Sequence, residues 1–174
     1  MGFLDYFKKN GLKENTGIEG RCTVKVRHWN PETKTYGDWI YLAKDKKNLL
    51  TNDGRDLFHA QCYTNTSAGT RGSGFIALSE NATAPADGDT AVAGEISTNG
   101  LARADATTKT HTTGTATTTI QHTFTAAAAF TAVQKSGLFN ASSGVTLTHE
   151  NTFTSTALAT NDQLQVTWTL TLND

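Results

Sequence analysis

The segment from Gln163 to Leu172 alternates strictly between apolar and polar residues, and this alternation constrains the fold more than any other feature. Its apolar positions are Leu164, Val166, Trp168, Leu170 and Leu172. The intervening positions are all Thr or Gln. A period of two places all apolar side chains on one face of an extended strand. The pattern predicts an antiparallel strand with one face in a core and the other in water.

Threonine dominates the second half of the chain. There are 32 Thr residues, of which 22 lie at or after Thr98. The branched Cβ of Thr suits the pleated surface of a sheet. A chain of 174 residues is long enough for one domain with a substantial core. We therefore expect an all-β protein: an antiparallel β-sandwich of jelly-roll or Ig-like type over residues 21–174, preceded by an arm of residues 1–20.

Further strand and turn signals are spread along the chain. The expected strands cover roughly 22–28, 36–43, 74–79, 101–110, 115–126, 132–139, 145–153 and 163–172. Asn52 or Asp53 can cap a short helix over residues 55–62, and residues 90–96 form a short helix or turn. About eight strands joined by short turns are typical of a β-sandwich.

The first 20 residues have a different character. Phe3, Leu4 and Phe7 fall at i, i+1 and i+4, which is one face of a helix too short to be stable alone. We expect a helical anchoring arm that becomes ordered only against a partner. Phe3, Leu4 and Phe7 would be inserted into the partner, and Lys8 and Lys9 would contact acidic groups around them.

Charge and hydropathy exclude several classes of function. The formal net charge of −1 provides no long-range attraction to nucleic acid or to an acidic membrane. No apolar run approaches the roughly 20 residues that span a bilayer. The first ten residues lack the apolar core of a signal peptide. These features predict a product made in the cytoplasm that binds neither nucleic acid nor membrane.

The two cysteines have no metal-site spacing. Cys22 and Cys62 stand 40 residues apart with no Cys-x-x-Cys motif. A reducing cytoplasm disfavours a disulfide. Two buried thiols that behave as small apolar residues are the preferred interpretation.

Histidines and acidic residues also lack the spacing of a reactive site. No pair among His28, His59, His111, His122 and His149 has the spacing of a His-x-His or His-Glu-x-x-His motif. His122 and His149 are predicted to be hydrogen-bonded residues at the edge of the core, with a metal on a trimer axis as the alternative.

Three remaining patterns have an ordinary structural interpretation. Asp87 and Asp89 flank a glycine, which is more typical of a turn than of a Ca²⁺ loop. Lys44, Lys46 and Lys47 form a basic run that we interpret as a solvated turn, with phosphate contact as the alternative. No Gly-x-Ser-x-Gly elbow activates a serine. We therefore expect no catalytic residue, cofactor or metal, and no hydrolase or lyase turnover.

Several longer motifs occur in a fixed order, and together they resemble a known family. They are NLLTNDGRDLFHAQCYT (48–64), FIALSENATAPADGDTAVAGEI (75–96), GLARA (100–104), KSGLFNASSGVTLTHENTF (135–153) and QLQVTWTLTL (163–172). The set is similar to small structural proteins of tailed bacteriophages, often described as tail-fibre or virion proteins. The resemblance covers residues 48–174 and implies a place in the virion.

The resemblance leads to two structural hypotheses. The first is a non-enzymatic capsid decoration (cement) protein, assembled in the host cytoplasm, that binds the major capsid protein or other virion proteins. A homo-oligomer, preferably a trimer, is expected in this case. The alternative is a tail, baseplate or fibre component that binds a receptor or carbohydrate through Trp29, Trp39 and Tyr41. A polysaccharide lyase or hydrolase is a third class, which the scarcity of acidic residues after Asp105 disfavours.

Overall fold

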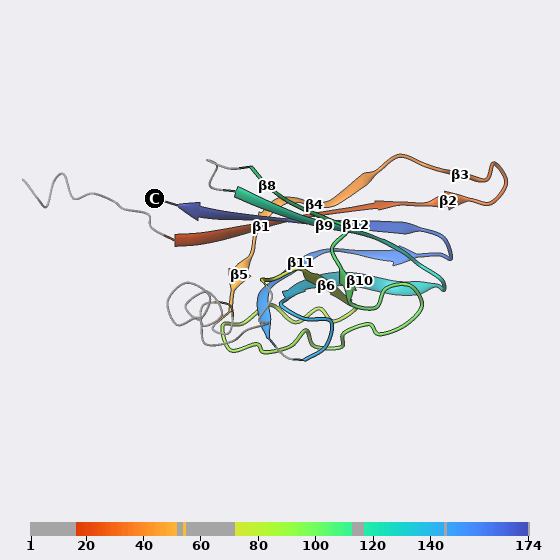
Figure 1. The fold of residues 1–174 in the computed structure, drawn as a ribbon. Helices are drawn as coiled ribbons and strands as arrows, with labels where there is room; N and C mark the ends of the chain where they lie inside the picture. Colours follow the sequence, from red (N-terminus) through yellow and green to blue (C-terminus); the bar gives the residue numbers. More distant parts are fainter. Residues whose placement is uncertain (1–16, 52–53, 55–71, 113–116, 145, 174) are drawn as a thin grey trace, which may run out of the picture.

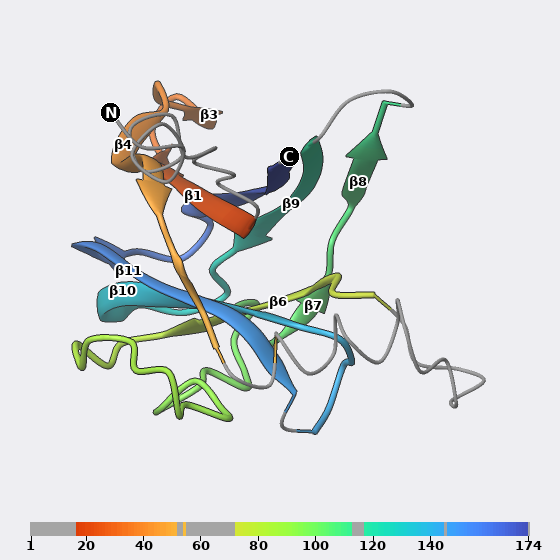
Figure 2. The same ribbon diagram turned by 90° about the vertical axis from the view of Figure 1, so that its left-hand side faces the viewer.

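The protein is a sandwich of two five-stranded antiparallel sheets (Figures 1 and 2). The computed structural model describes residues 17–51, 54, 72–112, 117–144 and 146–173. Among these residues strands predominate, and the predicted all-β antiparallel sandwich is confirmed. The expected helical arm, with Phe3, Leu4, Phe7, Lys8 and Lys9, and the expected helix over 55–62 lie outside the described residues.

The first sheet contains the first and the last strands of the described chain, side by side. Its strand order is β4-β1-β12-β9-β8. The strands are β4 (Ile40–Lys47), β1 (Gly17–Arg27), β12 (Gln163–Asn173), β9 (Thr117–Thr125) and β8 (Thr108–His111). β1 and β12 pair along their whole lengths, from Gly17 opposite Asn173 to Arg27 opposite Gln163. β1 therefore begins within the segment expected to be the arm.

The second sheet has the order β5-β11-β10-β6-β7. The strands are β5 (Leu49–Leu50), β11 (Leu147–Leu158), β10 (Phe130–Phe139), β6 (Phe75–Ser79) and β7 (Ala104–Asp105). A separate hairpin of β2 (Trp29–Asn30) and β3 (Thr35–Tyr36) extends beyond the end of the first sheet (Figure 1).

The main core lies between the two sheets and follows the alternation of the strands. Leu164, Val166 and Trp168 have no exposed surface, as their spacing predicts. Leu170 is only partly buried, and the side chain of Leu172 lies outside the described residues. In register, Trp168 stands between Cys22 on β1 and Ile120 on β9. Period-two patterning on neighbouring strands thus produces one shared apolar layer.

A second, smaller apolar cluster lies on the outer face of the second sheet. Ala77, Val92, Phe139 and Leu147 form this cluster. Val92 belongs to the long segment between β6 and β7, which covers the outer face. Gly137 is required there because a Cβ at this position would lie 2.3 Å from Cγ2 of Val92. The covering segment therefore lies in close contact with the sheet.

The prediction of one strand over residues 101–110 is wrong. Leu101 is a core residue outside any strand, and β7 and β8 lie in different sheets. The chain crosses between the sheets at residues 106–107, where the N–H of Ala106 donates to the carbonyl of Gly74 (2.8 Å). Strand propensity predicts extended backbone, but it cannot tell which sheet each part joins.

The strand predicted over residues 36–43 is likewise divided. Tyr36 belongs to β3, whereas β4 starts at Ile40 and continues to Lys47. The intervening backbone turns back toward β1, with the N–H of Gly37 donating to the carbonyl of His28 (3.0 Å). The interpretation of Lys44, Lys46 and Lys47 as a solvated turn is also wrong, because all three lysines belong to β4. Between 90 and 96, the predicted helix or turn is a turn.

Candidate interaction surface

The β2–β3 hairpin carries stacked aromatic and cationic side chains. The rings of Trp29 and Tyr36 meet edge to face, with centroids 4.9 Å apart and planes at 67°. The guanidinium of Arg27 lies 4.3 Å from the Tyr36 ring centroid and 4.6 Å from that of Trp39. Gln163 holds this guanidinium in place, because its Oε1 accepts from Nε (2.9 Å) and Nη2 (2.6 Å). The stack is thus anchored to β12.

The same arrangement continues onto β4. The ammonium groups of Lys25 and Lys44 lie 4.8 Å and 5.3 Å from the centroid of the Tyr41 ring. Ile40 and Tyr41 are the exposed large hydrophobic residues of the described chain, at 54% and 49% exposure. We call this region the aromatic surface and define it by Lys25, Arg27, Trp29, Tyr36, Trp39, Ile40, Tyr41 and Lys44. Each exposed cation–π contact stabilises by about 0.5–1 kcal/mol, so the surface is partly preorganised.

Asp162 fastens the base of the hairpin to the sandwich. Its Oδ1 accepts from the backbone N–H of Trp29 (2.7 Å), and its Oδ2 lies 2.6 Å from Nδ1 of His28. The N–H of Ala159 also donates to Oδ2 (2.9 Å). Burial by itself raises the pKa of this carboxyl, but the hydrogen bonds from Ala159, His28 and Trp29 outweigh it and lower the pKa. His28 follows the end of β1, and its side chain is about half exposed.

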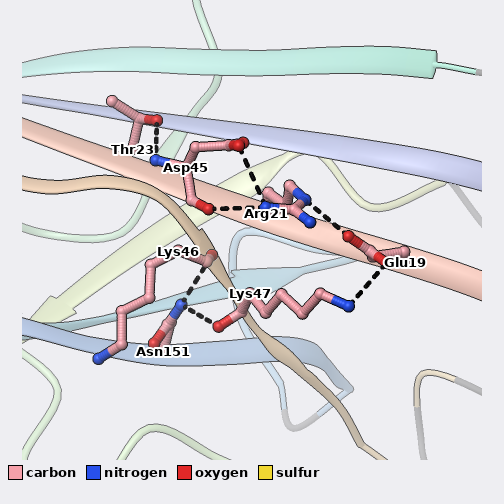
Figure 3. Close-up of polar contacts among 7 residues, drawn as sticks. All are labelled: Glu19, Arg21, Thr23, Asp45, Lys46, Lys47 and Asn151. Carbon is pink, nitrogen blue, oxygen red and sulfur yellow. Dashed lines mark hydrogen bonds and ion pairs between the residues drawn. The ribbon is translucent and has the colours of Figure 1, made fainter.

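Charged side chains form a second network where β1 meets β4 (Figure 3). Arg21 bonds Glu19 through Nε (2.6 Å) and Asp45 through Nη1 (3.1 Å), and Nζ of Lys47 lies 3.1 Å from Glu19. The hydrogen bonds from Lys47 and then Arg21 lower the pKa of Glu19. Asp45 has a left-handed backbone (φ 51°) and lies beside register shifts in the β1–β4 pairing. Irregular backbone and lysines on an edge strand discourage pairing with another chain.

The basic run serves mainly structural contacts. Nζ of Lys46 donates to the carbonyl of Thr152 (2.6 Å) in the second sheet. Nδ2 of Asn151 donates to the carbonyls of Lys46 (3.3 Å) and Lys47 (2.9 Å), as Figure 3 shows. These bonds tie β4 to β11 across the sandwich. The arrangement gives no support to phosphate binding by these lysines.

The remaining predicted residues do not converge on one site. Cys22 is a buried free thiol whose pKa is raised by burial, and Cys62 lies outside the described residues. His149 is buried, whereas His122 is half-buried with its ring 4.5 Å from that of Phe124. Asp89 closes a turn, because its Oδ2 accepts from the N–H of Ala86 (2.7 Å).

The sequence identified three members of the aromatic surface but not its organisation. Trp29, Trp39 and Tyr41 were candidates as exposed aromatics, and all three lie on it. Arg27 and Lys25 were missed. Both residues occupy alternate, outward-facing positions of β1, which the sequence pattern already indicates. The folded chain is needed to bring the rings of Tyr36, Trp39 and Tyr41 close to their charged groups.

Within the described part of the chain, no group of three or more His, Cys, Asp or Glu residues is arranged to hold a metal ion. The described residues also contain no helix with the length and hydropathy needed to span a bilayer. Comparisons with protein-family models, curated proteins and solved structures find no match to this chain. The phage resemblance stays a prediction.

Proposed function

We propose that this chain is a non-enzymatic structural protein of a bacteriophage particle, and specifically a capsid decoration protein. The observation that carries the proposal is the outward-facing side of β9 and β12 in the first sheet, where neutral Thr and Gln side chains bond across the two strands. Nε2 of Gln121 donates to Thr167 (2.8 Å), and Nε2 of Gln165 donates to Thr123 (3.1 Å). This β9–β12 portion of the sheet presents uncharged side chains that are bonded to one another, which suits repeated contacts in a lattice. The ordered motifs shared with phage structural proteins add support.

Copy number in purified particles tests this function. Quantitative mass spectrometry of virions should find the chain in the hundreds of copies that a decorated head requires. A handful of copies per particle would indicate a fibre, spike or baseplate component instead. Absence from purified particles would contradict any virion role.

Attachment through the N-terminal arm leads to a testable prediction. A variant that begins at Gly17 retains all of β1 and should fold, because β1 pairs with β12 from that residue onward. Loss of Phe3, Leu4 and Phe7 removes roughly 1.5–3 kcal/mol of burial each before ordering costs. We expect at least about tenfold weaker binding to undecorated particles. Unchanged affinity, measured with a variant whose circular dichroism matches that of the full chain, would contradict the anchoring role.

The aromatic surface favours a second candidate, a receptor-binding tail or fibre component. Here Trp39 and Tyr41, with the cations beside them, would contact an acidic polysaccharide of the host surface. Rings beside cations provide apolar contact together with charge complementarity to sugar carboxylates.

A charge-matched pair of variants tests this second candidate. Lys25→Gln should weaken binding to host polysaccharide severalfold, whereas Lys109→Gln should not. Lys109 serves as the control because it lies on β8, at the opposite edge of the same sheet, and pairs with Asp105. Binding could be measured by isothermal calorimetry at low salt. Equal loss in the two variants would indicate only non-specific charge attraction.

A further inference from the structure

A lysine and a glutamate are buried together on the outer face of the second sheet. Lys135 lies on β10, and Glu150 on β11 stands opposite Gly137, two residues further along β10. Diagonal neighbours of this kind are within reach of long side chains. Nζ of Lys135 lies 3.2 Å from Oε1 of Glu150, and the two side chains are 2% and 0% exposed. Lys and Glu are almost never buried so completely unless they are paired.

The ion pair by itself does little to offset the desolvation cost of burying these two charged groups. Beyond the ion pair with Lys135, neither carboxyl oxygen of Glu150 has a hydrogen-bond partner among the described residues. A buried ion pair repays its desolvation only with good geometry and additional hydrogen bonds. Burial raises the pKa of Glu150, and the neighbouring Asp89 raises it further, against the lowering effect of Lys135. Burial therefore weakens the preference of Glu150 for its charged form.

Asp89 provides a second carboxyl group close to that of Glu150. It belongs to the covering segment between β6 and β7, where a turn with Ala86 fixes it through two hydrogen bonds (2.7 Å and 3.0 Å). Val92 of the same segment lies against Gly137, the residue paired with Glu150. A lysine, a glutamate and a second carboxyl group are thus held together beneath the covering segment, with Lys135 and Glu150 buried and Asp89 partly buried.

We propose that Lys135 and Glu150 become joined by an amide bond after folding, with Asp89 carrying the proton. Transfer of a proton from the Lys135 ammonium to the Glu150 carboxylate gives an amine and a carboxylic acid, and Nζ of Lys135 then attacks Cδ of Glu150, which forms the N–C bond. The Asp89 carboxylate takes a proton from the amine and passes it to the departing hydroxyl as the C–O bond breaks. One water molecule leaves, and no oxidant, reductant or cofactor is required. The amide replaces two groups that are costly to bury and links β10 covalently to β11.

Mass spectrometry of the purified full-length chain tests this proposal directly. The intact mass should be one water below that of the sequence, once the N-terminal residue has been identified. Trypsin should fail to cleave after Lys135, so residues 110–174, which contain no other Lys or Arg, should appear as one peptide lighter by one water. Cleavage after Lys109 is the internal control, because this lysine pairs with Asp105 in an exposed position.

Two variants separate the linkage from other losses of water. A cyclic imide at Asp87-Gly88 gives the same intact mass but leaves Lys135 cleavable, and this result would overturn the proposal. Asp89→Asn and Lys135→Arg should both restore the full mass, and Asp89→Asn should also restore cleavage after Lys135. A wild-type chain of full mass that is cleaved after Lys135 would show an ion pair only. Linkage of residues 110–174 to residues 72–103 would overturn Glu150 as the acceptor.

Discussion

Replacing Trp168 with alanine is expected to lower the free energy of unfolding by roughly 3–5 kcal/mol. Trp168 has no exposed surface and lies between Cys22 and Ile120 in register. Removing its ring leaves a cavity. The strands around it cannot easily move together to close this cavity, because β1 and β9 are both hydrogen-bonded to β12 along its length. The midpoint and slope of urea denaturation, followed by circular dichroism, give the change directly.

Thr169→Ala is the matched control for this prediction. Thr169 is adjacent on the same strand but points to the opposite face and is only partly buried. A change within about 0.5 kcal/mol is expected there. Trp168→Phe should cost clearly less than Trp168→Ala, because it keeps a ring and removes an indole N–H that has no partner among the described residues. Similar losses for Trp168→Ala and Thr169→Ala would contradict the assignment of the two faces.

Acidification is expected to destabilise the fold through His149. This side chain is buried, and its ring centroid lies 6.1 Å from that of Trp168. Burial lowers the pKa of His149 from 6.5 to about 4. Below pH 6.5 the unfolded chain gains a proton that the native state accepts only near pH 4. Stability is therefore lost as the pH falls through this window, by about 3 kcal/mol in total.

His149→Leu isolates this contribution from those of the carboxyl groups. Asp162 has a lowered pKa and also loses stabilising contacts in acid. Glu150, in any chains where it remains a free carboxyl group, has a raised pKa and acts in the opposite direction. Both groups are present in the wild type and in the variant, so their effects cancel in the difference. The gap between the two stability curves should change by about 3 kcal/mol between pH 7 and pH 4. Parallel curves would mean that His149 does not titrate differently on folding.

The Lys135–Glu150 pair connects stability with the proposed place in a virion. An amide between neighbouring strands would resist unfolding without any added partner, which is a useful property in a particle exposed to the environment. Its formation does not depend on the virion role, however. Intact mass and copy number in particles are separate measurements, and each proposal can fail without the other.

Local patterning predicted the sheets more reliably than their connections. The alternation at Leu164, Val166 and Trp168 was sufficient to predict a half-buried strand, because side chains on a strand point to opposite faces regardless of the neighbours. It could not reveal that residues 101–110 divide between the two sheets. That division depends on Ala106 bonding to Gly74, a contact between residues far apart in sequence.

The same distinction between local pattern and long-range contact applies to the aromatic surface and to the buried Lys135–Glu150 pair. An all-β chain with a core-facing Trp168 and exposed aromatics is predictable from residue order alone, since hydrophobic period and residue type act locally. By contrast, the folded arrangement is needed to bring Arg27 close to the rings of Tyr36 and Trp39 and to bury Lys135 against Glu150. Both arrangements arise from strand register and from the covering segment. These are set by long-range pairing, which residue spacing along one strand does not encode.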